Sequence, residues 1–201
     1  MVARIGIIDY GLGNLGSLVN VLKDLNCAVV VSSDPSELKG ISHLILGGVG
    51  SFDTGRKNLM RLKLDDFILE HTYNLENKLL GICLGFQLLG ESSMEGEESG
   101  LGILPIRFEK FSGVNTKVPH IGWNYSMISD SASLGKSGSY YFVHSYFAKL
   151  SEYSLNSVSG YSYYNQTFVS YAETNNICGC QFHPEKSGKL GLDLLEKFIK
   201  W

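Results

Sequence analysis

The feature that most constrains the fold of this 201-residue chain is a cysteine flanked by glycines, in the sequence Gly81-Ile82-Cys83-Leu84-Gly85. The apolar run 79–82 predicts a buried strand, and residues 84–91 have the spacing of a helix. A G-x-C-x-G sequence between strand and helix matches a nucleophile elbow, a sharp turn that exposes its central side chain. The glycines allow the close backbone packing of such a turn. The motif therefore predicts an α/β architecture with Cys83 at the end of a central strand.

Alternating apolar and amphipathic segments in the first half are typical of strand-helix-strand units on a parallel sheet. We expect strands at residues 4–8, 28–31, 43–46 and 79–82, and helices at residues 15–25, 52–73 with a break near Lys63, and 84–91. The second half, up to Gln181, has short aromatic and β-branched segments between Gly, Ser and Asn, which indicates mostly antiparallel sheet. These segments surround Phe108, Val118, Trp123, Tyr141, Phe168 and Ile177, and a final amphipathic helix carries Leu190, Leu194, Leu195 and Ile199.

Composition limits the class of protein. With 44% hydrophobic and 18% charged residues, the chain is predicted to form one globular domain over residues 1–201. Its net charge of -3, without a run rich in Lys and Arg, argues against nucleic acid as a partner. Residues 3–8 resemble a strand rather than a secretion signal, and no apolar stretch reaches the roughly 20 residues of a membrane-spanning helix. We therefore expect a cytoplasmic protein that does not associate with membranes.

The four cysteines, Cys27, Cys83, Cys178 and Cys180, are too few and too unevenly spaced for a disulfide framework in a chain of this length. Cys178-Gly179-Cys180 is a weak metal motif, because no second cysteine or histidine pair stands at ligand spacing. A strand of small residues is the better interpretation. We expect reduced thiols, no metal site and no cofactor.

Cys83 is the candidate nucleophile. At the N-terminus of the following helix, the positive end of the helix dipole favours the thiolate form. The Leu84 backbone N–H is placed at the same turn to donate to a developing oxyanion. The alternative is a buried structural cysteine in a glycine-rich turn, and a base elsewhere in the chain decides between the two.

His183 is the candidate base. It follows an apolar strand in Gln181-Phe182-His183-Pro184-Glu185, and so belongs at a strand end, where the active sites of α/β proteins collect. Glu185 is two residues away and is suited to orient the imidazole, which completes a nucleophile, a base and an orienting group. The other histidines are better explained by packing or surface positions; they are His43, His71, His120 and His144.

Together, Cys83 and His183-Pro184-Glu185 resemble the Cys-His-Glu triad of class I glutamine amidotransferases. The resemblance runs nearly end to end and is strongest to the glutaminase subunits of imidazole glycerol phosphate synthases. It implies a flavodoxin-like fold, in which helices flank a mostly parallel central sheet with an additional antiparallel region. Six blocks carry it: Asp9-Tyr10-Gly11-Leu12-Gly13-Asn14, Gly48-Val49-Gly50-Ser51-Phe52, residues 81–89, Pro119-His120-Ile121-Gly122-Trp123-Asn124, Tyr141-Phe142-Val143-His144-Ser145-Tyr146 and residues 181–188.

The resemblance implies an enzyme that hydrolyses glutamine to glutamate and ammonia through a thioester on Cys83, with His183 and Glu185 completing the triad. It also implies a heterodimer with a (β/α)8-barrel cyclase subunit, which receives the ammonia directly for histidine biosynthesis. The implied oxyanion donors are backbone N–H groups of Val49, Gly50 and Leu84. The implied glutamine-binding residues are Gly50, Gln87, Glu95, His144, Ser145 and Tyr146. The implied partner contacts are Asn14, Trp123, Asn124, Tyr141 and Lys186.

One departure from the family pattern stands in the loop before Gly48-Val49-Gly50, where the usual proline is replaced by Gly47. Glycine leaves the loop freer than proline does. This predicts weaker suppression of glutamine hydrolysis when the partner is absent. The same glutaminase chemistry also suits a paralogous barrel that supports the amidination of bacterial surface sugars, and the sequence separates the two acceptors poorly.

Three other interpretations compete. Gly11-Leu12-Gly13-Asn14-Leu15-Gly16, followed by Asp34, matches a dinucleotide-binding fingerprint, but it leaves the cysteine elbow and His183 unexplained. A non-catalytic scaffold would keep the same fold with the triad residues serving only as packing. A stand-alone cysteine hydrolase would turn over fully without a partner.

Overall fold

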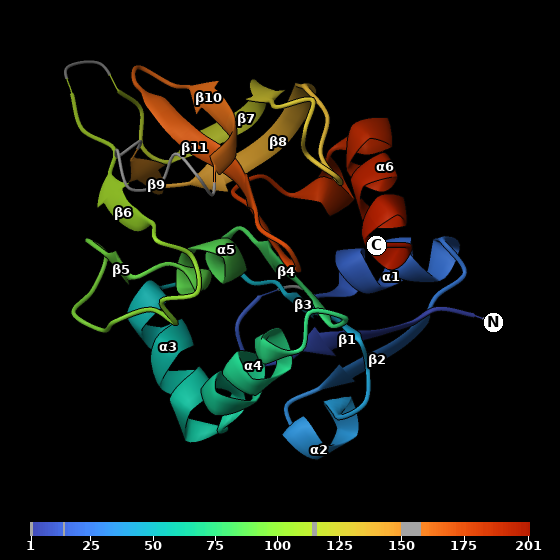
Figure 1. Ribbon diagram of the computed structural model, residues 1–201. Helices are drawn as coiled ribbons and strands as arrows, with labels where there is room; N and C mark the ends of the chain where they lie inside the picture. Colours follow the sequence, from blue (N-terminus) through green and yellow to red (C-terminus); the bar gives the residue numbers. More distant parts are fainter. Residues whose placement is uncertain (1, 14, 114–115, 150–157) are drawn as a thin grey trace.

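The computed structural model describes residues 2–13, 15–113, 116–149 and 158–201. Figure 1 shows its elements. The helices are α1 (Gly16–Asp24), α2 (Pro35–Leu38), α3 (Phe52–Arg61), α4 (Leu64–Tyr73), α5 (Leu84–Leu89), α6 (Gly188–Ile199) and a 3₁₀ helix (Pro184–Lys186). The strands are β1 (Arg4–Ile8), β2 (Ala28–Ser32), β3 (His43–Leu46), β4 (Lys78–Ile82), β5 (Ser92–Ser93), β6 (Arg107–Lys110), β7 (His120–Ile128), β8 (Gly138–His144), β9 (Tyr146–Lys149), β10 (Val158–Tyr163), β11 (Thr167–Glu173) and β12 (Ile177–Cys180).

One continuous sheet joins the two halves of the chain. Its main path runs β2-β1-β3-β4-β12-β11-β10-β7-β8, and the pairs from β2 to β12 are parallel, whereas those from β12 to β8 are antiparallel. The predicted fold class, a mostly parallel sheet extended by an antiparallel region, is confirmed. The Ile177 segment, β12, pairs antiparallel with β11, as the mostly antiparallel second half predicts, and it is also a parallel neighbour of β4. That parallel pairing brings the C-terminal end of β12 beside the cysteine elbow.

Helices cover both faces of the parallel strands, with α1 and α6 on one side and α3 and α4 on the other (Figure 1). Successive strand residues point to opposite faces. Accordingly Leu80 packs in the core under α1 and α6, while its neighbour Leu79 packs in the core with the other helices. Because β4 is buried on both faces, it reads in the sequence as a continuous apolar run.

Side-chain and backbone features explain where several elements begin and end. The predicted break in the 52–73 helix falls at Lys63, which has a left-handed backbone with φ of 57° and separates α3 from α4. The short helix α2 was not predicted, although Asp34 caps it by accepting from Ser36 N–H at 2.8 Å. The prediction of a strand around Val118 was wrong, because this residue lies in a bend before a cis peptide bond to Pro119.

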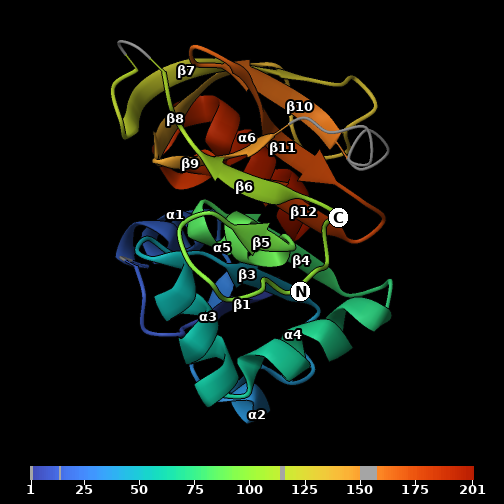
Figure 2. The same cartoon turned by 90° about the vertical axis from the view of Figure 1, so that its left-hand side faces the viewer.

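A short branch of the same sheet is formed where β9 pairs with β11 and β6 pairs with both β9 and β5 (Figure 2). This branch supports the loop of residues 94–99, since Met94 N–H donates to the Phe108 carbonyl of β6 at 2.8 Å.

The helices within the described residues are all too short or too polar to span a membrane.

Candidate active site

Cys83 stands at the turn between β4 and α5, with a left-handed φ of 54°. The turn needs both flanking glycines. A Cβ atom on Gly85 would lie 1.6 Å from the Leu46 carbonyl oxygen, and one on Gly81 would lie 2.6 Å from the Leu89 side chain. The expected reason for the glycines, close backbone packing at a nucleophile elbow, is therefore confirmed.

The structure brings His183 and Glu185 to the same edge of the sheet. β12 pairs with β4 in register from Ile177 to Cys180, so the segment after β12 emerges beside the elbow. His183 N–H donates to the Tyr141 carbonyl at 2.9 Å, and Pro184 then starts the 3₁₀ helix. His183 Nδ1 lies 2.8 Å from Glu185 Oε1, which fixes the ring orientation.

The electrostatics of His183 depend on its two neighbours. Burial disfavours the imidazolium and would lower the pKa of His183, but the Cys83 sulfur and the Glu185 carboxylate stabilise it and raise the pKa to about 10. With Nδ1 bonded to Glu185, Nε2 is the nitrogen left for proton exchange. It is buried and makes no hydrogen bond of ordinary geometry among the described residues, but it interacts with the Cys83 sulfur closely enough for that sulfur to raise the pKa of His183. Cys83, His183 and Glu185 thus lie together as a nucleophile, a base and an orienting carboxylate.

A cavity of about 220 Å³ opens at the Cys83 side of this arrangement. Among its lining residues, Gln87 is buried and its amide donates to the Tyr146 carbonyl at 3.4 Å and to Gln181 at 3.2 Å. Every residue that the resemblance assigned to glutamine binding lies on this cavity. Its lining is Val49, Gly50, Cys83, Leu84, Gln87, Glu95, Pro119, Val143, His144, Ser145 and Tyr146.

The expected oxyanion donors are arranged in a closed state. Leu84 N–H, at the first residue of α5, donates to the Gly48 carbonyl with an N–O distance of 3.4 Å. That carbonyl therefore takes the place in which a substrate oxygen would accept the same bond. Gly48 itself has no room for a side chain, since a Cβ atom would lie 1.9 Å from the Tyr10 hydroxyl.

His120 and His144 form a buried pair rather than a second base. Their Nδ1 and Nε2 atoms are 2.9 Å apart, and His144 Nδ1 also contacts the Tyr146 carbonyl at 2.7 Å. Burial lowers the pKa of His120 to about 4 and, with smaller contributions from its neighbours, that of His144 to about 3. Both rings pack among aromatic side chains including Phe142 and Phe168, as expected for packing histidines.

The residues expected at a partner surface lie on the outer side of the antiparallel region. Trp123 is 60% exposed and packs edge to face with Tyr141 at 6.1 Å between ring centroids, and Lys186 is exposed nearby on the 3₁₀ helix. Asn124 is half-buried and donates to the Tyr163 carbonyl at 2.9 Å, so its amide has an internal role. Asn14 lies outside the described residues.

Three further residues border Cys83 without having been predicted as site residues. Gln181 Nε2 lies 3.8 Å from the Cys83 sulfur, and that sulfur lies 3.6 Å from the Val143 carbonyl. The Tyr10 hydroxyl is buried beside Gly48, and burial together with the Cys83 charge raises its pKa. All three lie in the sequence blocks that resemble the amidotransferase family, and this position was the one sign in the sequence that they belong to the site.

The dinucleotide interpretation does not fit the geometry. The Gly13 backbone packs directly on that of Gly48, since a Cβ atom on Gly13 would lie 2.8 Å from Gly48 Cα. Gly13 thus serves a close contact between two loops, which accounts for this glycine without a bound pyrophosphate. Within the described ranges, no group of three or more His, Cys, Asp or Glu side chains is arranged to hold a metal ion.

Comparisons with known proteins agree with this geometry. A family model for class I glutamine amidotransferases matches residues 6–201. The chain is 43% identical to the imidazole glycerol phosphate synthase subunit HisH 2 of Methanococcus maripaludis, over 98% of each protein. It is 41% identical to the HisH subunit of a Geobacillus strain, over 96% of this chain and 95% of that protein.

Solved structures show the same fold at lower identity. A structure described as a glutamine amidotransferase has a TM-score of 0.76 at 18% identity, covering 98% of this chain and 97% of that one. The structure of PurLQS from Thermotoga maritima has a TM-score of 0.74 at 16% identity, covering 100% of this chain and 99% of that one.

A cysteine elbow beside a His–Glu pair at the edge of a parallel sheet has the arrangement of an enzyme that cleaves amides through a cysteine. The chain belongs to the class I glutamine amidotransferase family and, within it, to the imidazole glycerol phosphate synthase HisH subunits.

Proposed function

We propose that this protein is the glutaminase subunit of an imidazole glycerol phosphate synthase, with Cys83 as nucleophile, His183 as base and Glu185 as orienting carboxylate. One observation carries the proposal. The cysteine elbow after β4 adjoins the paired His183 and Glu185 after β12, and a cavity suited to a small amino acid opens at the sulfur. The close similarity to HisH subunits supports the same function.

In the proposed reaction, the Cys83 thiolate attacks the carboxamide carbon of glutamine, and the carbonyl oxygen takes the negative charge. His183 then donates its Nε2 proton to the leaving nitrogen as the C–N bond breaks, which releases ammonia and leaves a thioester. A water molecule that gives its proton to His183 attacks the thioester. Glutamate leaves and the sulfur is regenerated, so the balance is glutamine plus water to glutamate plus ammonia.

The raised pKa of His183, about 10, suits this sequence because it favours the imidazolium, which can donate a proton to the leaving nitrogen. Glu185 keeps the Nδ1 proton in place and stabilises that charge. We propose that Glu185 stays ionised throughout, as an orienting group and not as a proton acceptor.

The oxyanion requires a change in the Gly48 loop. We propose that the Gly48 peptide turns away from Leu84, which frees the Leu84 N–H and lets N–H groups of Val49 and Gly50 face the substrate oxygen. Each such donor typically contributes about 10²- to 10³-fold in rate. Since the closed loop blocks one donor, the isolated protein should hydrolyse glutamine slowly.

We propose that the partner is a (β/α)8-barrel cyclase and that it docks on the outer face of β7. Every second residue of β7 is a large apolar side chain that is more than half exposed, and Tyr163 of β10 continues the same face. Exposed apolar patches of this kind mark protein interfaces, and aromatic residues supply much of their binding energy. The residues of β7 are Ile121, Trp123, Tyr125 and Met127.

Substitution and labelling test the glutaminase proposal. The glutamine analogue diazo-oxo-norleucine should alkylate Cys83 and abolish ammonia release, and Cys83→Ala should lose both labelling and activity. Mass spectrometry of the labelled peptide identifies the site. If the analogue labels no residue, or if Cys83→Ala still releases ammonia, the proposed mechanism is wrong.

The ammonia acceptor is tested separately. Co-expression with the barrel protein encoded nearby should give glutamine-dependent formation of imidazole glycerol phosphate. A barrel that aminates a sugar instead would show the alternative acceptor with the same glutaminase. We propose further that residues 1–201 act as one amidotransferase domain in the cytoplasm, with glutamine as the small-molecule substrate.

A further inference from the structure

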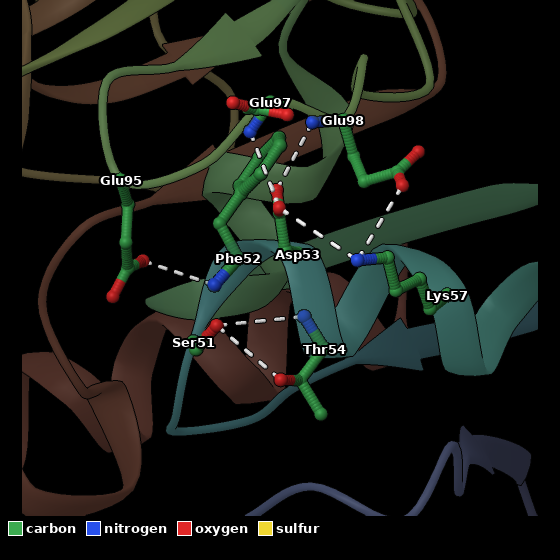
Figure 3. A network of polar contacts seen from close by, with 8 residues as sticks. All are labelled: Ser51, Phe52, Asp53, Thr54, Lys57, Glu95, Glu97 and Glu98. Atoms are coloured by element: carbon green, nitrogen blue, oxygen red, sulfur yellow. Dashed lines mark hydrogen bonds and ion pairs between the residues drawn. The ribbon is translucent and has the colours of Figure 1, made fainter.

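Residues 94–99, Met94-Glu95-Gly96-Glu97-Glu98-Ser99, form an acidic loop at the rim of the cavity. Glu95 is the residue of this loop that lines the cavity, and its Oε2 accepts from Phe52 N–H at 2.9 Å. Phe52 is the first residue of α3, and its N–H and the helix dipole favour the Glu95 carboxylate. Burial, with a smaller contribution from the Asp53 charge, nevertheless raises the pKa of Glu95. Figure 3 shows the Glu95 carboxylate bonded to Phe52 N–H at the start of α3, and the same residue lines the cavity.

Asp53, the next residue of α3, holds the far side of the acidic loop. Its carboxylate accepts from Glu98 N–H at 3.0 Å and from Glu97 N–H at 3.2 Å (Figure 3). The loop backbone lies directly on this carboxylate, since a Cβ atom on Gly96 would be 1.8 Å from Asp53 Oδ1. Asp53 does not line the cavity itself. It holds the two residues that follow Glu95 and Gly96.

The charges make this anchor necessary. Asp53 and three glutamates of the loop crowd one corner, and like charges at this range repel one another. Lys57 offsets part of the charge, with its ammonium 4.0 Å from Asp53 and 3.7 Å from Glu98, but it is 61% exposed. Exposed ion pairs contribute little, whereas backbone N–H groups bonded to a carboxylate are strong. The two hydrogen bonds from Glu97 N–H and Glu98 N–H to the Asp53 carboxylate therefore contribute most to holding the acidic loop in place.

We propose that Asp53 is a positioning residue for glutamine binding: it fixes the acidic loop so that the Glu95 carboxylate stays at the cavity, where it receives the α-ammonium group of the substrate. This inference rests on the proposed glutaminase function. It assigns to Asp53 an effect on substrate affinity that acts through Glu95, with no direct contact to the substrate and no part in the chemical steps.

A double-mutant cycle tests the proposal. Asp53→Asn removes the charge and one acceptor oxygen, and should raise KM for glutamine about 10-fold while kcat changes less than about 2-fold. In a Glu95→Gln background, the same substitution should change KM by less than about 2-fold, because the residue through which Asp53 acts has lost its charge. Asp193→Asn, the same change at a partly exposed position of α6 that pairs with Lys189, is the matched control and should leave KM unaltered.

Two results would overturn the proposal: an unchanged KM in Asp53→Asn, or an equal rise of KM in both backgrounds. Gly96→Ala provides a second variant if Asp53→Asn folds poorly, since the added methyl group displaces the loop from Asp53 and should raise KM in the same way. Failure of the proposed function gives a different result. In that case the unaltered protein is not alkylated at Cys83 by diazo-oxo-norleucine, whatever residue stands at position 53.

Discussion

Gly47→Pro tests how the loop before the oxyanion site controls hydrolysis in the absence of a partner. Gly47 follows β3 and borders a cavity of about 70 Å³. A Cβ atom at this position would lie 3.8 Å from the side chains of Leu15 and Leu18, an ordinary contact. A proline ring therefore fits the available space, and its main effect is to fix φ near the value of about −65°.

The magnitude follows from the closed state of the loop. The bond from Leu84 N–H to the Gly48 carbonyl is long, at 3.4 Å, and a neutral hydrogen bond contributes about 0.5–1.5 kcal/mol net. The closed and open loops therefore differ by a small free energy. Proline at a compatible site stabilises a folded chain over an unfolded one by about 0.4–1 kcal/mol, because it removes conformational freedom, and we take the same size for its effect on the loop. If that free energy favours the closed loop, the basal rate falls about 2- to 5-fold.

The assay measures glutamate formed from saturating glutamine by the purified protein without a partner. Gly47→Ala is the control, because it adds a Cβ atom in the same space but restricts φ far less than proline does; its basal rate should stay nearer to that of the unaltered protein. With the partner bound, all three proteins should reach similar rates. Equal basal rates for Gly47→Pro and the unaltered protein would show that position 47 does not limit the turning of the loop.

Further predictions concern the base, the buried histidines and the elbow. Glu185→Gln should lower kcat at least about 10-fold and lower the pKa of His183 from about 10 toward its ordinary value, as read from NMR titration. Because the folded-state pKa of His183 is raised, the stabilisation by this pair is complete below the ordinary pKa and is lost as the pH rises through about 10. The free energy of unfolding of Glu185→Gln in urea should therefore fall less at alkaline pH than that of the unaltered protein. His120 and His144 have lowered pKa values of about 4 and about 3, so their stabilisation is present above the ordinary pKa and is lost as the pH falls through those values. At about pH 5 each should already cost on the order of 2 kcal/mol in unfolding free energy, and unchanged stability between pH 7 and 5 would contradict this. Gly85→Ala should destabilise the protein by about 1–3 kcal/mol or more, because the new methyl group meets the β3 backbone; a neutral result in urea would refute that packing.

Local signals in the sequence predicted those elements that depend on neighbouring residues. The elbow is an example, since Gly81 and Gly85 flank Cys83 in the sequence and Gly81 packs against Phe86 and Leu89 of the helix that follows. The helix break at Lys63 was found for the same reason. The helical spacing of apolar residues is interrupted near Lys63, and this interruption alone indicates where the first helix ends. The contact of Gly85 with Leu46 of β3, in contrast, is not local.

Contacts between distant residues could not be predicted in this way. The parallel pairing of β12 with β4 joins residues nearly a hundred positions apart, and no spacing in the chain indicates it. The same holds for Gln181, whose amide reaches the Cys83 sulfur, and for Asp53, whose carboxylate holds the backbone at Glu97 and Glu98. The sequence also gave no sign that the Gly48 carbonyl accepts a hydrogen bond from Leu84 N–H.

The proposed partner surface and the proposed base meet at one residue, Tyr141. Its ring packs against exposed Trp123, while its carbonyl accepts from His183 N–H at 2.9 Å and its own N–H donates to the Ser187 hydroxyl at 3.0 Å. That hydroxyl also donates to the His183 carbonyl at 2.6 Å. A partner that contacts the Trp123–Tyr141 pair therefore contacts the residue whose backbone holds the imidazole in place. Substitutions of the Tyr141 ring should weaken partner binding while these backbone bonds, and with them the position of His183, are retained.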